Sequence, residues 1–136
     1  MKQSVDVALI LWNRDVIDLV AWVLSQHQLT SRGIEPSEGT ERMENFIFSC
    51  SPTVVVMDLE PPYHRSGVAA MYLQRRFPEH SFVMTCADSA LARKNAPWVS
   101  CFPIFQKPYA IDEIGNTLDS MVRRASKNIA MASIGI

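Results

Sequence analysis

Short apolar runs alternate with amphipathic segments between Val5 and Met121, and five of each can be distinguished. The runs are five to seven residues long and rich in β-branched residues, whereas apolar residues in the segments between them recur every three or four positions. This alternation is typical of βα units that form a parallel sheet covered by helices on both faces. The five expected strands are residues 5–11, 29–34, 53–57, 81–85 and 101–105.

The helices expected between these strands carry several end signals. Asp15 lies in the first turn of the first helix, where negative charge suits the helix dipole. The third helix is expected to begin near Gly67. Asp88 can cap a short fourth helix, which must end near Pro97 because proline disfavours helical geometry in the residue before it.

Two further predictions concern the position of the fifth strand in the sheet and the C-terminal end of the domain. Pro103 cannot donate a hydrogen bond to a neighbouring strand, so the strand that contains it is expected at a sheet edge. Helical periodicity fades from Lys127, and small residues follow. We therefore expect one domain over residues 1–126 and a flexible C-terminal tail over residues 127–136.

Composition narrows the functional classes. The chain has 136 residues, 13 Lys and Arg against 14 Asp and Glu, a formal net charge of −1, and 48% hydrophobic residues. A chain of this length supports one core without disulfides or structural metal. The balanced charge argues against direct nucleic-acid binding, which favours a basic surface. No apolar stretch is long enough for a membrane span or a signal peptide, so we expect a cytoplasmic protein.

Cysteine and histidine spacing gives no sign of a metal or disulfide framework. Cys50, Cys86 and Cys101 form no CxxC pair, and the three histidines are not spaced as ligands. We expect three buried free thiols in a reducing compartment.

Polar residues follow four of the five expected strands. Trp12 and Asn13 come after the first strand, Asp58 after the third, Thr85 ends the fourth, and Lys107 follows the fifth. Right-handed crossovers place the carboxyl ends of parallel strands at one edge of the sheet, where ligands bind in such folds. A carboxylate, a hydroxyl and an ammonium group are therefore expected to meet there.

Three segments carry a resemblance to a known family. They are Val-Val-Val-Met-Asp-Leu-Glu-Pro-Pro at 54–62, followed by Gly67, then Phe-Val-Met-Thr-Cys-Ala at 82–87, and Phe-Gln-Lys-Pro-Tyr at 105–109. Their order and spacing resemble the receiver domain of bacterial two-component response regulators, over about residues 5–124. The resemblance implies a flavodoxin-like (CheY-like) α/β fold, with five parallel strands in the order 2-1-3-4-5 and five helices.

The resemblance also implies residue roles. Asp58 would be the phosphoacceptor, taking a phosphoryl group from the phosphohistidine of a sensor histidine kinase or phosphotransfer protein. Thr85 and Lys107 would contact the phosphoryl oxygens, and the Lys107–Pro108 peptide would be cis. Ile104 stands where the family often has a Tyr or Phe that changes rotamer on phosphorylation. Its neighbour Phe105 is expected to point to the opposite face of the sheet.

One departure from the family concerns the metal. Receivers usually end the first strand with two acidic residues, which bind Mg²⁺ together with the phosphoacceptor and a carbonyl two residues beyond it. This chain has Trp12 and Asn13 there, so its remaining ligand set would be Asn13, Asp58 and Glu60. An asparagine oxygen can ligate Mg²⁺ but supplies no charge, and an indole at the pocket floor would fill the space of a hydrated ion. We expect Mg²⁺ to bind weakly or not at all.

Three functional hypotheses remain open. The first is a phosphoaccepting receiver that signals to an effector protein in trans through the face of the fourth helix, fifth strand and fifth helix, which is also a possible homodimer face. The second is a pseudo-receiver, a protein-interaction module that works without phosphorylation. The third is an enzyme on the same fold, and it is disfavoured. The loop at residues 11–15 has no glycine for a flavin phosphate, and Glu60 stands where a dehalogenase-type hydrolase needs an aspartate.

Overall fold

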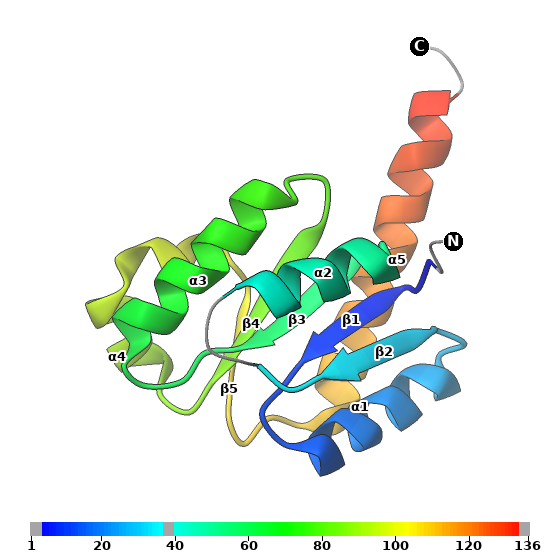
Figure 1. Cartoon of the computed structure of the whole chain (residues 1–136). Helices are drawn as coiled ribbons and strands as arrows, with labels where there is room; N and C mark the ends of the chain where they lie inside the picture. Colours follow the sequence, from blue (N-terminus) through cyan, green and yellow to red (C-terminus); the bar gives the residue numbers. More distant parts are fainter. Residues whose placement is uncertain (1–3, 37–39, 134–136) are drawn as a thin grey trace.

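The computed structural model of the chain describes residues 4–36 and 40–133, with side chains up to residue 128, and it contains a five-stranded parallel sheet (Figure 1). The strand order is β2-β1-β3-β4-β5, which confirms the expected flavodoxin-like arrangement. The strands are β1 (Val7–Ile10), β2 (Ser31–Ile34), β3 (Val54–Asp58), β4 (Ser81–Cys86) and β5 (Ile104–Gln106).

Five α-helices and one 3₁₀ helix connect the strands and cover the sheet. α1 and α5 contact each other on one face, whereas α3, α4 and η1 pack together on the other (Figure 1). Their bounds are α1 (Arg14–Gln26), α2 (Glu41–Cys50), α3 (Tyr63–Arg76), α4 (Ser89–Asn95), the 3₁₀ helix η1 (Pro97–Cys101) and α5 (Ile111–Ser133). None of the helices in the described part of the chain has the length and apolar character needed to cross a membrane.

The core consists of two apolar clusters, one on each face of the sheet. Alternate residues of β1 serve opposite clusters: Val7 and Leu9 pack with α1 and α5, while Ala8 and Ile10 pack with α2 and α3. Every residue of β1 and β3 is buried. The near-continuous apolar runs in the sequence are therefore central strands covered on both faces.

Most strand boundaries differ from the expectation by one or two residues, and the starts of α3 and of the fifth strand differ by more. α3 begins at Tyr63 rather than near Gly67, because the backbone amides of Arg65 and Ser66 already bond to the Pro62 carbonyl. The fifth strand begins at Ile104 rather than at Cys101, because Cys101 ends the 3₁₀ helix η1, which starts at Pro97 in a position that proline favours. β5 is accordingly only three residues long, and it lies at the sheet edge as predicted.

Two further expectations need correction. The helix α5 continues through Ser133, so residues 127–133 of the expected tail are helical. They contain no glycine or proline that would stop the helix; residues 134–136 lie outside the described part. Cys50 and Cys86 are buried free thiols as expected, but Cys101 is exposed because it closes η1 at the surface.

Candidate functional site

The carboxyl ends of the central strands bring the predicted polar residues together. Asp58 is the last residue of β3, and its register partner on β4 is Thr85. Lys107 follows β5 directly, and its backbone amide bonds to the Cys86 carbonyl at 2.8 Å, so the end of β4 positions it. The side chain of Asp58 is 3% exposed, which places a carboxylate almost entirely inside the protein.

Three donors satisfy the Asp58 carboxylate. The Lys107 Nζ lies 3.1 Å from Asp58 Oδ1, and the Thr85 hydroxyl donates to the same oxygen. The other oxygen, Oδ2, accepts a hydrogen bond of 2.9 Å from the backbone amide of Trp12. Residues from four strand ends thus meet at one carboxylate, as the strand pattern predicted. The Lys107–Pro108 peptide is cis, as the resemblance implied.

The electrostatics of the site are those of a buried ion pair with hydrogen-bond support. A buried carboxylate is costly unless it is paired and hydrogen bonded, and Lys107 supplies the balancing charge. The negative charge of Asp58 also affects the pKa of Tyr109. The pKa of the Tyr109 phenol is raised, first by burial and then by this nearby negative charge.

Two of the residues expected around a metal have hydrogen-bond partners of their own. The Asn13 side chain caps α1, and its Oδ1 accepts from the Asp15 amide at 2.8 Å. The Glu60 carbonyl accepts from the Ser66 hydroxyl at 3.0 Å. In the residues that the structure describes, no three His, Cys, Asp or Glu side chains are grouped in a way that could hold a metal ion. This donor set is a poor match for Mg²⁺, which prefers several oxygen ligands and carboxylate charge.

Trp12 is 44% exposed and lines a cavity that Asp58 also lines. That its indole takes the space of a hydrated ion stays a prediction. The backbone amide contributes the hydrogen bond to Asp58.

Hydrogen bonds tie the loop after Thr85 to neighbouring elements. The Asp88 side chain caps α4 by accepting from the Leu91 amide at 3.0 Å, as predicted, and its backbone amide donates to the Tyr63 hydroxyl at 3.2 Å. Burial is the main cause of the raised pKa of Tyr63. The amide and hydroxyl of Ser89 both donate to Gln106 Oε1, at 2.9 and 2.8 Å.

Sequence reasoning did not identify Tyr63 and Gln106. Tyr63 follows a Pro-Pro pair in what was expected to be loop, and Gln106 lies beside the more prominent Lys107. Only the fold shows that both contact the loop that follows Thr85.

The side chains of β5 divide between the two faces of the sheet. Ile104 is half-buried against the cluster that contains Phe102, whereas Phe105 packs on the opposite face, where its ring lies 6.4 Å from that of Tyr109. The predicted opposite orientation of Phe105 is therefore confirmed. A switching role for Ile104 remains a prediction.

Comparisons with known proteins identify the fold. No protein-family profile and no curated protein matches this sequence. Among solved structures, a signal receiver domain of a Luxo repressor protein from Vibrio parahaemolyticus superposes with a TM-score of 0.73 and 14% identity, over 96% of this chain and 98% of that one. A CheY-like response regulator receiver domain protein from Methanospirillum hungatei superposes with a TM-score of 0.71 and 11% identity, over 94% of this chain and 99% of that one.

A third neighbour is a transiently phosphorylated switch in bacterial signal transduction, with a TM-score of 0.69 and 17% identity, over 91% of this chain and 99% of that one. These similarities confirm the predicted resemblance to receiver domains at the level of the fold. At 11 to 17% identity they concern the fold alone, so the chemistry must be argued from the residues of this chain.

Proposed function

We propose that this chain is a receiver domain in two-component phosphorelay signalling and that Asp58 is its phosphoacceptor. The donor would be the phosphohistidine of a sensor histidine kinase or of a phosphotransfer protein. One observation carries the proposal: a buried carboxylate at the end of β3 has both the Thr85 hydroxyl and the Lys107 ammonium at one of its oxygens. The arrangement lies at the carboxyl ends of parallel strands, and ligands bind at this edge in such folds, which supports the proposal.

The two carboxylate oxygens would have different roles. Oδ2 accepts only the Trp12 amide hydrogen bond among the described residues, so it keeps a lone pair for attack on phosphorus. The bond from phosphorus to the histidine nitrogen breaks as the bond from Asp58 Oδ2 to phosphorus forms, which gives an acyl phosphate, and the leaving imidazole nitrogen takes a proton from water. Lys107 and Thr85, now at Oδ1, would turn to the phosphoryl oxygens, which need positive charge and a hydroxyl donor.

Metal binding would be weak in this proposal. Asp58 is the only carboxylate among the three expected ligands that donates charge, since Asn13 is neutral and caps α1 and Glu60 was expected to offer its carbonyl. Among the residues that the structure describes, Lys107 supplies the one positive charge in contact with Asp58.

The output would be a change in protein contacts rather than a catalysed reaction. Hydrogen bonds between Ser89 and Gln106 join the start of α4 to β5. Because this pair lies close in the chain to Thr85 and Lys107, a shift of Thr85 toward a phosphoryl group would move it as well. The face of α4, β5 and α5 would then bind an effector protein in trans, or a second copy, in the cytoplasm. No nucleic acid or membrane partner is proposed.

A second candidate function rests on a specific observation. Both Asp58 oxygens already have donors, and the first strand is followed by Trp12 and Asn13 instead of an acidic pair. The closed network suits a pseudo-receiver, whose partners bind the fold without phosphorylation.

Phosphorylation of the intact chain by a small-molecule donor separates the two candidates. We would incubate the wild type and Asp58→Asn with Mg²⁺ and acetyl phosphate and measure intact mass. The phosphoacceptor proposal predicts a gain of one phosphoryl group in the wild type and none in the variant. A wild type that stays unmodified at high Mg²⁺ would support the pseudo-receiver, and equal modification of both proteins would exclude Asp58 as the acceptor.

A further inference from the structure

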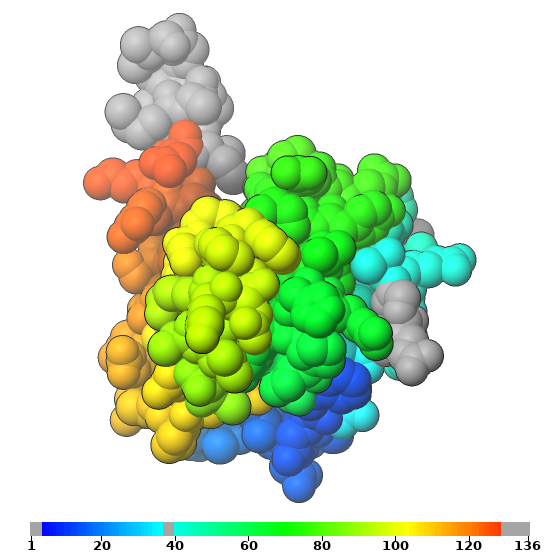
Figure 2. All heavy atoms as spheres, turned by 90° about the vertical axis from the view of Figure 1, so that its left-hand side faces the viewer, coloured from blue at the N-terminus to red at the C-terminus, as the bar shows by residue number. Residues whose placement is uncertain are grey.

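A cavity of about 630 Å³ opens beside Asp58, and neither Thr85 nor Lys107 lines it. It lies between α2 and α3 and is bounded by the segments that follow β1 and β3. On the face shown in Figure 2, α3 and the segment before it (green) lie next to the start of α2 (cyan) and the residues after β1 (blue). Its volume is within the roughly 300–1,000 Å³ typical of small-molecule sites.

The walls of this cavity are mostly apolar, with aromatic rings and thioethers. Trp12 and Tyr72 are about half exposed, at 44% and 45%, although both line the cavity. Met43 and Met57, which are buried, also line the cavity, and thioether sulfur interacts favourably with aromatic rings. Indole and phenol rings beside methionine sulfur form a surface suited to a flat aromatic ring.

Two charged side chains at the cavity have no oppositely charged partner among the described residues. Arg65, Val68 and Tyr72 are spaced three and four residues apart, so they share the face of α3 that lines the cavity. Within residues 4–36 and 40–128, the guanidinium of Arg65 has no carboxylate partner and the carboxylate of Glu60 has no cation partner. Asp58, the third charged residue at the cavity, is already paired with Lys107.

We propose that this cavity binds a small planar aromatic ligand that carries an anionic group. The ring would lie between Trp12 and Tyr72, and the anion would meet the planar guanidinium of Arg65, which suits carboxylate, sulfonate and phosphate geometry. Glu60 would accept a hydrogen bond from a ring N–H or hydroxyl group. Because the Trp12 amide bonds to Asp58, an occupant would contact both the cavity wall and a residue that holds the candidate phosphoacceptor.

The ligand site does not depend on phosphorylation of Asp58. If the acetyl phosphate experiment gives no modification, the cavity, its aromatic walls and Arg65 are unchanged. A ligand would then be an alternative input to the same fold.

Fluorescence titration with 8-anilinonaphthalene-1-sulfonate, which carries a sulfonate on a flat naphthalene ring system, tests the proposal. The titration uses the full chain with the substitutions Trp22→Phe and Trp98→Phe, so that Trp12, at the cavity wall, is the only indole. We expect saturable quenching of Trp12 with one probe molecule per chain. Thioflavin T, a planar cation, and inorganic phosphate, an anion without a ring, should bind at least about tenfold more weakly.

Matched variants identify the contacts. Arg65→Gln should weaken binding of the sulfonate probe by about tenfold, because hydrogen bonds between charged groups are stronger than neutral ones. Arg75→Gln, at the other end of α3, should leave the affinity for the probe unchanged. Tyr72→Ala should weaken binding, and Leu91→Ala, an exposed apolar residue on α4 outside the cavity, should not. Circular dichroism confirms that each variant is folded.

Three results would overturn the proposal. They are quenching that does not saturate, equal effects of Arg65→Gln and Arg75→Gln, and tighter binding of thioflavin T than of the sulfonate. The first would indicate adventitious adsorption to exposed apolar surface, and the third would indicate that Glu60 rather than Arg65 sets the charge preference.

Discussion

At the scale of single residues, the site is organised around one buried charge. Asp58 is almost inaccessible, yet its carboxylate contacts an ammonium, a hydroxyl and a backbone amide. A buried charge that loses its partner destabilises a protein strongly, whereas loss of both partners costs less. The coupling between Asp58 and Lys107 is therefore measurable even without a phosphoryl donor.

Lys107→Met is predicted to lower the free energy of unfolding by roughly 1–3 kcal/mol, because Asp58 then keeps its charge without the nearest cation. The Lys107 side chain is 35% exposed, and water therefore screens part of its attraction to Asp58. This screening favours the lower part of the range. Urea denaturation measures the loss. In an Asp58→Asn background the same substitution should cost less, by roughly 1 kcal/mol or more. Equal costs in the two backgrounds would show that the pair does not interact.

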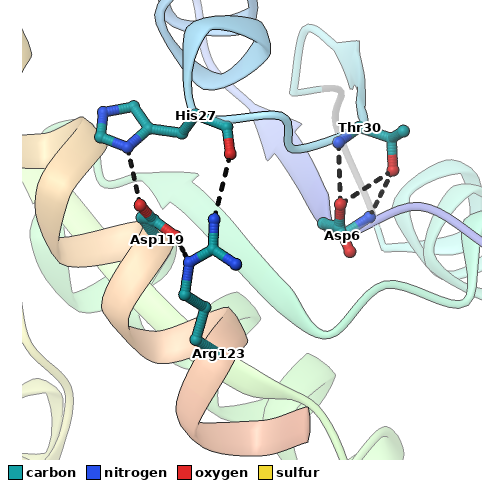
Figure 3. Close-up of polar contacts among 5 residues, drawn as sticks. All are labelled: Asp6, His27, Thr30, Asp119 and Arg123. Carbon is teal, nitrogen blue, oxygen red and sulfur yellow. Dashed lines mark hydrogen bonds and ion pairs between the residues drawn. The ribbon is translucent and has the colours of Figure 1, made fainter.

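At the scale of elements, close packing between helices fixes the two layers around the sheet. A Cβ added at Gly67 of α3 would lie 2.8 Å from the Cβ of Ala96 and 3.2 Å from Cγ1 of Val99. On the other face, polar contacts join the C-cap of α1 to α5: His27 Nδ1 lies 2.8 Å from Asp119 Oδ2, and the Arg123 guanidinium donates to the His27 carbonyl at 3.3 Å (Figure 3). Within α5, Arg123 Nε lies 2.5 Å from Asp119 Oδ1. The packing at Gly67 is steric and the contacts of Asp119 are electrostatic, so they lead to two separate predictions.

Gly67→Ala should destabilise the protein by roughly 1–3 kcal/mol, because α3 must move away from the segment that joins α4 to η1. Helix propensity alone predicts the opposite sign, since alanine usually stabilises a helix relative to glycine. The neighbouring exposed substitution Val68→Ala serves as the control and should change stability by less than about 0.5 kcal/mol. A more stable Gly67→Ala protein in thermal denaturation would contradict this packing.

Asp119→Asn should lower the melting temperature near neutral pH but not in strong acid. The pKa of Asp119 is lowered, first by its hydrogen bond with His27 and further by Arg123. A carboxyl group with a lowered folded-state pKa stabilises the protein above its ordinary value, about 3.9, and this stabilisation is lost as pH falls through the folded-state pKa. The gap between wild type and variant should therefore close below about pH 3.9.

Melting curves over this pH range measure the gap. Asp18→Asn, an exposed residue of α1 without an ion pair among the described side chains, is the control. A gap that is independent of pH would rule out the charge of Asp119 as its cause.

At the scale of the whole molecule, the sequence predicted the sheet and the meeting of its polar strand ends. This worked because β-branched runs identify buried strands, and the topology of parallel strands brings Asp58, Thr85 and Lys107 to one edge. The Trp12 amide at Asp58 could not be predicted, because every residue except proline has such an amide. The cavity near Arg65 depends on how α2 and α3 pack, and the length of α5 depends on weak helix propensities beyond Lys127.

The central claim is that this receiver-like fold presents Asp58 without the acidic pair expected after the first strand, and a Trp12→Asp, Asn13→Asp double variant tests it. Aspartate is also a good helix N-cap, and the backbone amide at position 12 is retained, so the fold should be preserved. The two added carboxylates should increase affinity for Mg²⁺ by at least about tenfold, because a close charge pair contributes several kcal/mol at an effective dielectric of about 20.

The most direct measurement is the Mg²⁺ concentration that gives half-maximal phosphorylation by acetyl phosphate, read as intact mass for the wild type and the double variant. We predict that the wild type needs at least about ten times more Mg²⁺ than the variant, and that Asp58→Asn abolishes modification of both. Equal Mg²⁺ requirements, or modification that persists without Asp58, would contradict the claim.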